Sequence, residues 1–300
     1  MILLDSAKPF YKANFHLHTT NSDGRRSPEE VIALYREQGY DVLAITDHWK
    51  VTRESYLDEG MLVLSGVEFD FNLPGQVIHM LGLGVQPDIL EKVSRASGPQ
   101  RAADEIARQG GVAVLAHPAW SLNPPSTMCA LSGVTCAEVY NTVSGTPWNG
   151  DRADSTSLLD VTAAQGKLYR FLATDDAHFY NGDQCRSFTM LQAESLTQEG
   201  VLAALKSGAF YASRGPEIYR YTFDGEVFVI DCSPASRIVF SSDLNWVNGR
   251  CLAGENLTHA EYVVQANRYE RFVRCQIWDA DGLCAWTSPV AVGFERDSRG

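Results

Sequence analysis

Basic residues are scarce in this sequence relative to acidic ones. The 300 residues include 25 lysines and arginines against 37 aspartates and glutamates, a formal net charge of −12. A surface with this balance repels most of a long polyanion, so we expect no long nucleic acid as a partner. A small anionic substrate remains compatible with the sequence, because bound metal cations reverse the field locally.

The sequence also lacks a basic and apolar leader, and it has no apolar run near the ~20 residues that cross a bilayer. The seven cysteines are odd in number and include no Cys-x-x-Cys pair, a pattern typical of reduced thiols. Hydrophobic residues make up 45% of the chain, enough for a packed core. We therefore expect a cytoplasmic protein without a membrane partner.

Strand and helix signals alternate over the first two-thirds of the chain. A helix is expected to begin with Ser27 as N-cap, Pro28 at its first position and Glu30 closing a capping box, and to stop at Gly39. Apolar runs predict strands at 14–19, 42–46, 62–69, 112–116, 136–140 and 168–173, a hairpin arm at 77–85, and helices at 102–109, 155–165 and 197–207. Repeated strand–helix units with apolar strands favour a parallel sheet, most economically a closed barrel.

The pattern changes after Gly215 and Pro216. Short alternating runs replace the helical period, and turn dipeptides such as Asp224-Gly225 and Asn248-Gly249 separate them. This pattern indicates a small antiparallel β domain of the sandwich type. The predicted organisation is thus an α/β domain at 1–215 followed by a β domain at 216–300.

Histidines and acidic residues gather at the predicted strand ends. His16 and His18 are two residues apart, a spacing that puts both side chains on one face of a strand. Similar candidates follow at other strand ends or in the loops beside them: Asp23, His48, Glu68, His79, His117, Asp176 and His178. The seventh histidine, His259, lies in the β region and is expected on the ordinary surface.

These nine residues should converge, because the carboxyl ends of parallel strands open on one face of a barrel. Each motif alone has a structural explanation, such as a turn or a polar strand end. Together they favour metal binding, because buried charges cost several kcal/mol unless they are paired or bound to metal. Imidazole and carboxylate suit zinc, iron or manganese, and nine ligands exceed the needs of one ion. We expect a cluster of two or three divalent ions that activates water for hydrolysis.

The ordered motifs resemble those of the PHP (polymerase and histidinol phosphatase) superfamily. The similarity runs from residues 14–24 through 44–48, 66–68, His79 and 116–118 to 176–178, about two-thirds of the chain. It implies a distorted (β/α)7 TIM-like barrel and metal-dependent phosphoester hydrolysis. The segment 208–216 and the β domain after it resemble the CehA/McbA-like branch, some members of which cleave carbamate or carboxyl esters.

Carried over by motif, the resemblance implies three ion sites, the first two of which share Glu68. Many members have histidine where Asp23 stands here, although an acidic residue also occurs in a subgroup. The implied sites are a first with His16, His18, Glu68 and Asp176, a second with Glu68, His79 and His117, and a third with Asp23, His48 and His178.

The leading functional hypothesis is hydrolysis of a small phosphate ester or phosphodiester. Asp176 or His178 would move the proton, and Arg25, Arg26 and Arg214 are candidates to bind phosphate, since guanidinium suits bidentate contact. One alternative is a carboxyl or carbamate ester hydrolase with the same metals. Another is a non-catalytic, metal-stabilised binding module. The β domain could cap the site or hold a homo-oligomer together.

Overall fold

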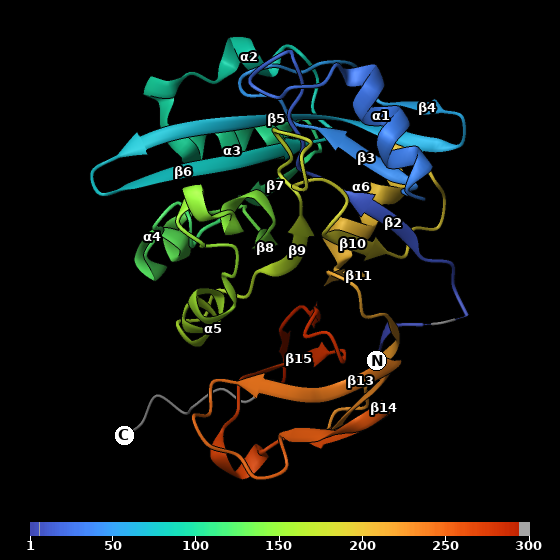
Figure 1. Cartoon of the computed structure of the whole chain (residues 1–300). Coiled ribbons are helices and arrows are strands. Elements are labelled where there is room, and N and C mark those ends of the chain that lie inside the picture. The colour runs from blue at the N-terminus through green and yellow to red at the C-terminus, as the bar shows by residue number, and fades with distance from the viewer. Residues whose placement is uncertain (6, 294–300) are drawn as a thin grey trace.

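The computed structural model describes residues 1–5 and 7–293. It is a mixed α/β structure with two parts (Figure 1). Strands flanked by helices form one part, drawn in blue to yellow, and a layer of antiparallel strands drawn in orange and red lies beside it. In the described ranges no helix is long and apolar enough to cross a membrane.

A row of seven hydrogen-bonded strands forms the framework of the first part. Its members, in spatial order, are β2 (Tyr11–Asn14), β3 (Val42–Ile45), β5 (Met61–Leu73), β6 (Gln76–Leu83), β7 (Val112–Leu115), β8 (Cys136–Asn141) and β9 (Arg170–Thr174). Every pairing is parallel except those of β6, which runs antiparallel to β5 and β7. The end of each parallel strand and the start of β6 therefore meet at one rim.

Helices cover the outside of this row. They are α1 (Pro28–Glu37), α2 (Ile89–Lys92), α3 (Gly98–Arg108), α4 (Pro125–Ala130), α5 (Thr156–Ala164) and α6 (Gln198–Ser207). The predicted start of α1 is confirmed, because Ser27 accepts from the Glu30 backbone while the Glu30 carboxylate accepts from the Ser27 backbone. Gly39 follows the helix with a φ of +72°, a conformation that suits glycine.

The row does not close into a hydrogen-bonded barrel in the described part of the chain. Strand β10 (Phe188–Leu191) pairs with β2 and with β11 (Phe210–Ser213), but no ladder joins it to β9. Side chains satisfy β9 instead: Thr189 Oγ1 bonds both the N–H and the carbonyl of Ala173, and Ser288 Oγ accepts from Phe171 N at 2.9 Å. The expectation of a closed barrel missed this opening, because periodicity does not specify which edges pair.

The second part is antiparallel throughout. It contains β12 (Ile218–Phe223), β13 (Val227–Ser242), β14 (Cys251–Val263), β15 (Phe272–Trp278), β16 (Cys284–Thr287) and β17 (Val290–Ala291), and β1 (Ile2–Leu4) pairs with β12. Strand β13 joins two of the short alternating runs into one long strand, whose register shifts near Pro234. Of the predicted domain 216–300, residues 294–300 lie outside the described part.

The two parts are joined by a strand pair and a shared core. Strand β16 pairs with β11, matching Tyr211 with Thr287. Trp286 of β16 is 1% exposed and packs in the same apolar cluster as Phe69 and Phe171 of the first part. The antiparallel layer therefore contributes to the core of the strand row that carries the candidate site.

Candidate metal centre

The two histidines of the first motif lie just beyond the end of β2. The strand predicted at 14–19 lies instead at 11–14 and shares only Asn14 with the prediction, while an isolated bridge joins Leu17 to Ala177. His16 and His18 are both fully buried. Although the strand is shorter than predicted, the two side chains still enter one site.

The first group of ligand atoms is tight and buried. The Nε2 atoms of His16 and His18 lie 3.0–3.1 Å from Glu68 Oε2 and Asp176 Oδ1. Both Nε2 atoms and Asp176 Oδ1 are buried without a hydrogen-bond partner. Unpaired buried polar atoms of this kind are rare, and a cation between them would satisfy all of them. The donor set therefore fits a divalent ion.

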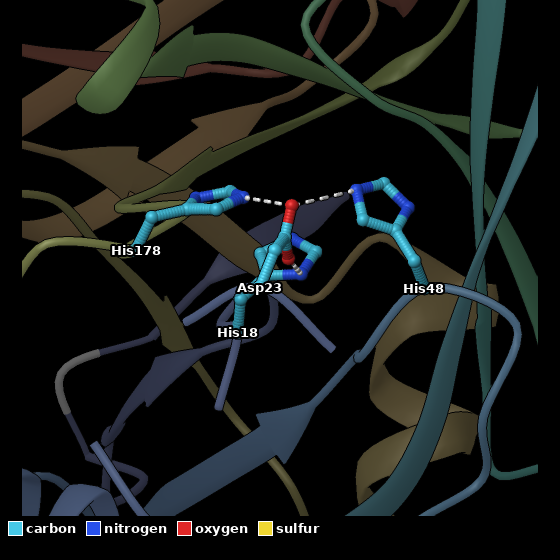
Figure 2. Close-up of side chains that lie close together, drawn as sticks. All are labelled: His18, Asp23, His48 and His178. Carbon is cyan, nitrogen blue, oxygen red and sulfur yellow. Dashed lines mark ion pairs between the residues drawn. The ribbon is translucent and has the colours of Figure 1, made fainter. Parts of the chain in front are cut away.

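A second group surrounds Asp23 (Figure 2). The Asp23 carboxylate lies between the rings of His178 and His48, with Oδ2 at 3.6 and 3.9 Å from their Nε2 atoms. Its other oxygen is 3.4 Å from His18 Nδ1. Asp23 itself is about half exposed, so this group opens toward solvent.

Glu68 joins the groups. Its Oε1 atom lies 2.7 Å from His79 Nδ1 and 3.4 Å from His117 Nε2, while Oε2 faces the first group. His48 Nδ1 is 3.5 Å from Oε2. His79 reaches the site because it lies on the reversed strand β6, opposite Asp70 of β5. The structure thus brings together the nine side chains expected as ligands.

The histidines and carboxylates of this cluster shift one another's pKa values. Burial alone would lower the pKa of His16, but Asp176, Glu68 and Glu138 outweigh it and raise that pKa well above 6.5. Burial would raise the pKa of Glu68, and the surrounding histidines instead hold it well below 4.5. The carboxylates therefore stay ionised and stabilise positive charge, whether it comes from protons or from a divalent cation.

Glu138 is a functional residue that the sequence analysis missed. It lies in β8, fully buried, and accepts four hydrogen bonds: from His16 Nδ1 at 2.7 Å and from the His117 backbone, Asn141 Nδ2 and Thr174 Oγ1 at 2.7–2.8 Å. The bond to Nδ1 leaves His16 Nε2 as the ligand atom. An acidic residue inside an otherwise apolar strand was the available signal.

Asp47 organises the loop that carries Asp23. It is fully buried and accepts from Thr19 N, Thr19 Oγ1 and Ser22 Oγ, each at 2.7 Å, and from Thr52 Oγ1 at 2.9 Å. These four bonds occupy the carboxylate, which explains why His48 and not Asp47 belongs to the ligand groups.

Backbone strain gathers at the same rim. Trp49, His117 and Asp176 have φ values of 54°, 31° and 53°, in a region that non-glycine residues seldom adopt. Such strain costs about 1–3 kcal/mol per residue and concentrates at functional sites. His117 and Asp176 are themselves candidate ligands, and Trp49 directly follows a third, His48. The strain therefore lies where the surrounding fold holds the ligands in place.

A cavity of about 240 Å³ opens onto the cluster. We call it the metal pocket; besides candidate ligands it is lined by Trp120, Val143, Ser144, Asn149 and Phe179. A second cavity of about 390 Å³, the outer cavity, is lined by Ser22, Asp23, His48, Asp70, His79 and Arg95. The two cavities share three candidate ligands, so they meet at the metal centre.

The three arginines expected to bind substrate lie at different distances from this pocket. Arg25 stacks 5.0 Å from the ring of Phe179, which lines the metal pocket. Arg26 lies 5.8 Å from the Tyr180 ring, and Arg214 lies 4.2 Å from the Tyr140 ring. Of the residues that line the metal pocket in the described structure, none is lysine or arginine.

Comparison with known proteins gives partial similarities. No model of a known protein family matches the chain. It is 36% identical over 80 residues to a 5'-3' exoribonuclease of Haemophilus influenzae, and 35% identical over 81 residues to a phosphoribosyl 1,2-cyclic phosphate 1,2-diphosphodiesterase of Eggerthella lenta. These matches cover 24% of this chain, and 28% and 30% of the two relatives.

One solved structure is similar over nearly the whole chain. It is a two-domain protein from Bacteroides vulgatus, described as containing a PHP-like metal-dependent phosphoesterase. The two share 16% sequence identity with a TM-score of 0.52, over 94% of this chain and 95% of the other. The similarity shows a shared fold.

Proposed function

We propose that this chain is a metal-dependent hydrolase of small phosphate esters or phosphodiesters, with a distorted (β/α)7 barrel of the PHP type, closest to the CehA/McbA-like branch. The observation that carries the proposal is the buried set of unpartnered ligand atoms on His16, His18 and Asp176 beside Glu68. The partial sequence similarity to a phosphodiesterase supports the same reaction class. The acidic net charge favours a small substrate over a long nucleic acid.

Two or three zinc, iron or manganese ions would be held by the groups described above. Bound metal lowers the pKa of a coordinated water and stabilises charge on the ester oxygens. Glu68 would be a ligand common to neighbouring groups, while Glu138 and Asp47 keep the ligands oriented. The chain's own residues thus provide oriented ligands, some of them fully buried, at a centre that opens toward solvent at Asp23.

Proton transfer falls to residues at the rim of the pocket. His178 Nδ1 lies 2.7 Å from the Asp176 carbonyl oxygen, and its Nε2 faces Asp23 on the open side. We propose that His178, or Asp176 beside it, moves the proton during hydrolysis. Among the three arginine candidates, Arg25 stacks on Phe179, which lines the metal pocket, whereas Arg26 and Arg214 stack on Tyr180 and Tyr140, which do not.

A carboxyl or carbamate ester is the second candidate substrate. The walls of the metal pocket support it, since Trp120, Val143 and Phe179 are apolar and the lining residues described there include no lysine or arginine. An uncharged ester group would suit such walls, and the same metals would polarise its carbonyl. A non-catalytic binding module would hold metal without turning over either class.

The deciding experiment measures metal content and turnover together. Protein purified without chelator would be assayed for bound metal and for hydrolysis of p-nitrophenyl phosphate, bis-p-nitrophenyl phosphate and p-nitrophenyl acetate. We expect two or three ions per chain and phosphoester turnover that falls at least a thousandfold in His16→Ala, in line with removal of a metal ligand. Hydrolysis of p-nitrophenyl acetate alone would favour the carboxyl or carbamate ester hydrolase instead. A folded protein that binds metal and hydrolyses none of them would contradict the hydrolase proposal.

A further inference from the structure

The outer cavity contains one permanent cation, Arg95, just after α2 in the short helix η1 (Arg95–Ser97). Among the described residues lining either cavity, it is the sole lysine or arginine. Its side chain is 63% exposed, so its remaining N–H groups are accessible from the cavity. Arg95 therefore gives the outer cavity a permanent positive charge, which the lining of the metal pocket lacks.

Arg95 is held in a fixed orientation. Its Nη2 and Nε atoms donate to the two oxygens of Asp70 at 2.8 and 3.1 Å, a bidentate pair. Its guanidinium also stacks 4.7 Å from the ring of Trp49, whose Nε1 donates to the same carboxylate. Because Asp70 uses two of the five N–H groups, three remain for a ligand. Pre-orientation of this kind reduces the entropy lost when an anion binds.

The arrangement connects directly to the metal centre. Asp70 Oδ1 lies 3.9 Å from His48 Nδ1, so one carboxylate separates the guanidinium from a candidate ligand. Trp49 follows His48 in sequence and has a strained φ of 54°, and its backbone N–H donates to the Glu68 carbonyl. The same backbone turn therefore positions both a ligand of the cluster and the ring on which Arg95 stacks.

We propose that the outer cavity is a subsite for a second anionic group of the substrate, bound by Arg95 while the scissile ester lies at the metal centre. The proposal rests on the proposed hydrolase function and narrows its substrate class to small phosphate esters that carry a second phosphate or phosphonate-like group. An ordinary surface ion pair would account only for the contact between Arg95 and Asp70. It does not explain the Trp49 stack or the position of the pair in a cavity shared with three candidate ligands.

The test uses α,ω-alkane bisphosphonates with three to six carbons and alkylphosphonates of equal carbon number. Their affinities for the metal-loaded protein would be measured by calorimetry and by competition with p-nitrophenyl phosphate. We expect one bisphosphonate length to bind about tenfold to a hundredfold more tightly than its matched monophosphonate, the range for hydrogen bonds to charged groups. Arg95→Ala should remove most of this ratio.

Arg101→Ala is the matched control. Arg101 is 49% exposed, pairs with Glu105 at 2.6 Å and lines neither cavity, so its removal should leave the ratio and the basal activity unchanged. A wild-type protein without preference for the bisphosphonate, or a preference that survives Arg95→Ala, would overturn the subsite. Calorimetry needs no turnover, so an Arg95-dependent preference in a protein that cleaves no ester would overturn the hydrolase proposal instead.

Discussion

At the scale of single residues, Glu138 shows how a side chain outside the ligand groups can control them. All four of its hydrogen-bond partners are donors, including His16 Nδ1. Glu138→Gln keeps the shape but turns an amide N–H₂ toward one of these donors. We expect metal affinity to fall about tenfold to a hundredfold, the usual effect of losing such a partner. Competition with a fluorescent chelator measures this.

Glu105→Gln is the control for that substitution. Glu105 is also buried, but it pairs with Arg101 and Arg108 on α3, away from the metal pocket. Metal affinity should stay at the wild-type value. Equal losses in the two variants would mean that Glu138 acts through general stability and not through His16.

His259 gives a pH-dependent prediction that is independent of metal. It was expected on the surface, and it is exposed there, with a hydrogen bond from Nδ1 to Asp231 that raises its pKa above 6.5. The protonated pair therefore stabilises the fold below the unfolded-state pKa, and this contribution is lost as pH rises through the folded-state pKa. It is small because the pair is exposed to solvent.

Asp231→Asn should return the pKa of His259 toward its ordinary value. The ring carbon resonance of His259, followed by NMR between pH 5 and 9, reports this directly. An unchanged midpoint in the variant would show that Asp231 is not the source of the shift. The neighbouring Glu261, whose carboxylate is 3.4 Å from Nε2, would then carry it.

At the scale of elements, the loop between β2 and α1 depends on Asp47 for its shape. Four donors from residues of this loop and of the segment after β3 converge on its buried carboxylate. Asp47→Asn turns an amide toward them and should release Asp23 from His48 and His178. We expect the affinity for the ion at the Asp23, His48 and His178 group to fall by about tenfold to a hundredfold, while the ions at the buried group stay bound.

Metal titration followed by elemental analysis checks that prediction. Thr52→Val removes one of the four donors and should have a smaller effect in the same direction. If Asp47→Asn loses every ion at once, the loop and the buried group form one unit. If it loses none, the loop holds its shape without Asp47.

At the scale of the whole molecule, the antiparallel part and the strand row share a core. Trp286 is buried among residues of the strand row and stacks on Tyr140 with ring centroids 5.9 Å apart. Trp286→Ala should lower the free energy of unfolding by about 3–5 kcal/mol, because a large buried side chain leaves a cavity. Urea unfolding monitored by circular dichroism measures the loss.

Trp246→Ala is the matched control, since Trp246 is 73% exposed and should change stability by less than about 0.5 kcal/mol. A single unfolding transition for both parts is also expected, because β11 and β16 pair across them. Two separate unfolding transitions, with Trp286→Ala shifting only the transition of the antiparallel part, would show that the two parts fold independently.

The sequence alone determined the longer helices and most strands of the first part, although not β10 or β11, and the residue types that gather at the metal centre. Local chemistry is sufficient for these: apolar runs favour buried strands, Ser27 and Glu30 form a capping box, and histidines at strand ends meet when the strands are parallel. The length of β13 and the open edge at β9 were not determined in this way, because pairing depends on distant partners.

Tertiary structure alone decided which polar groups support the candidate ligands. Glu138 bonds His16 from 122 residues away, Asp47 holds a loop 25–28 residues earlier, and Arg95 meets Asp70 across 25 residues. In sequence Glu138 and Arg95 are single charged residues without a motif, and the motif at 44–48 does not show that Asp47 bonds the earlier loop. Their roles arise because folding removes water around them, so that each charge must find its partner in the protein.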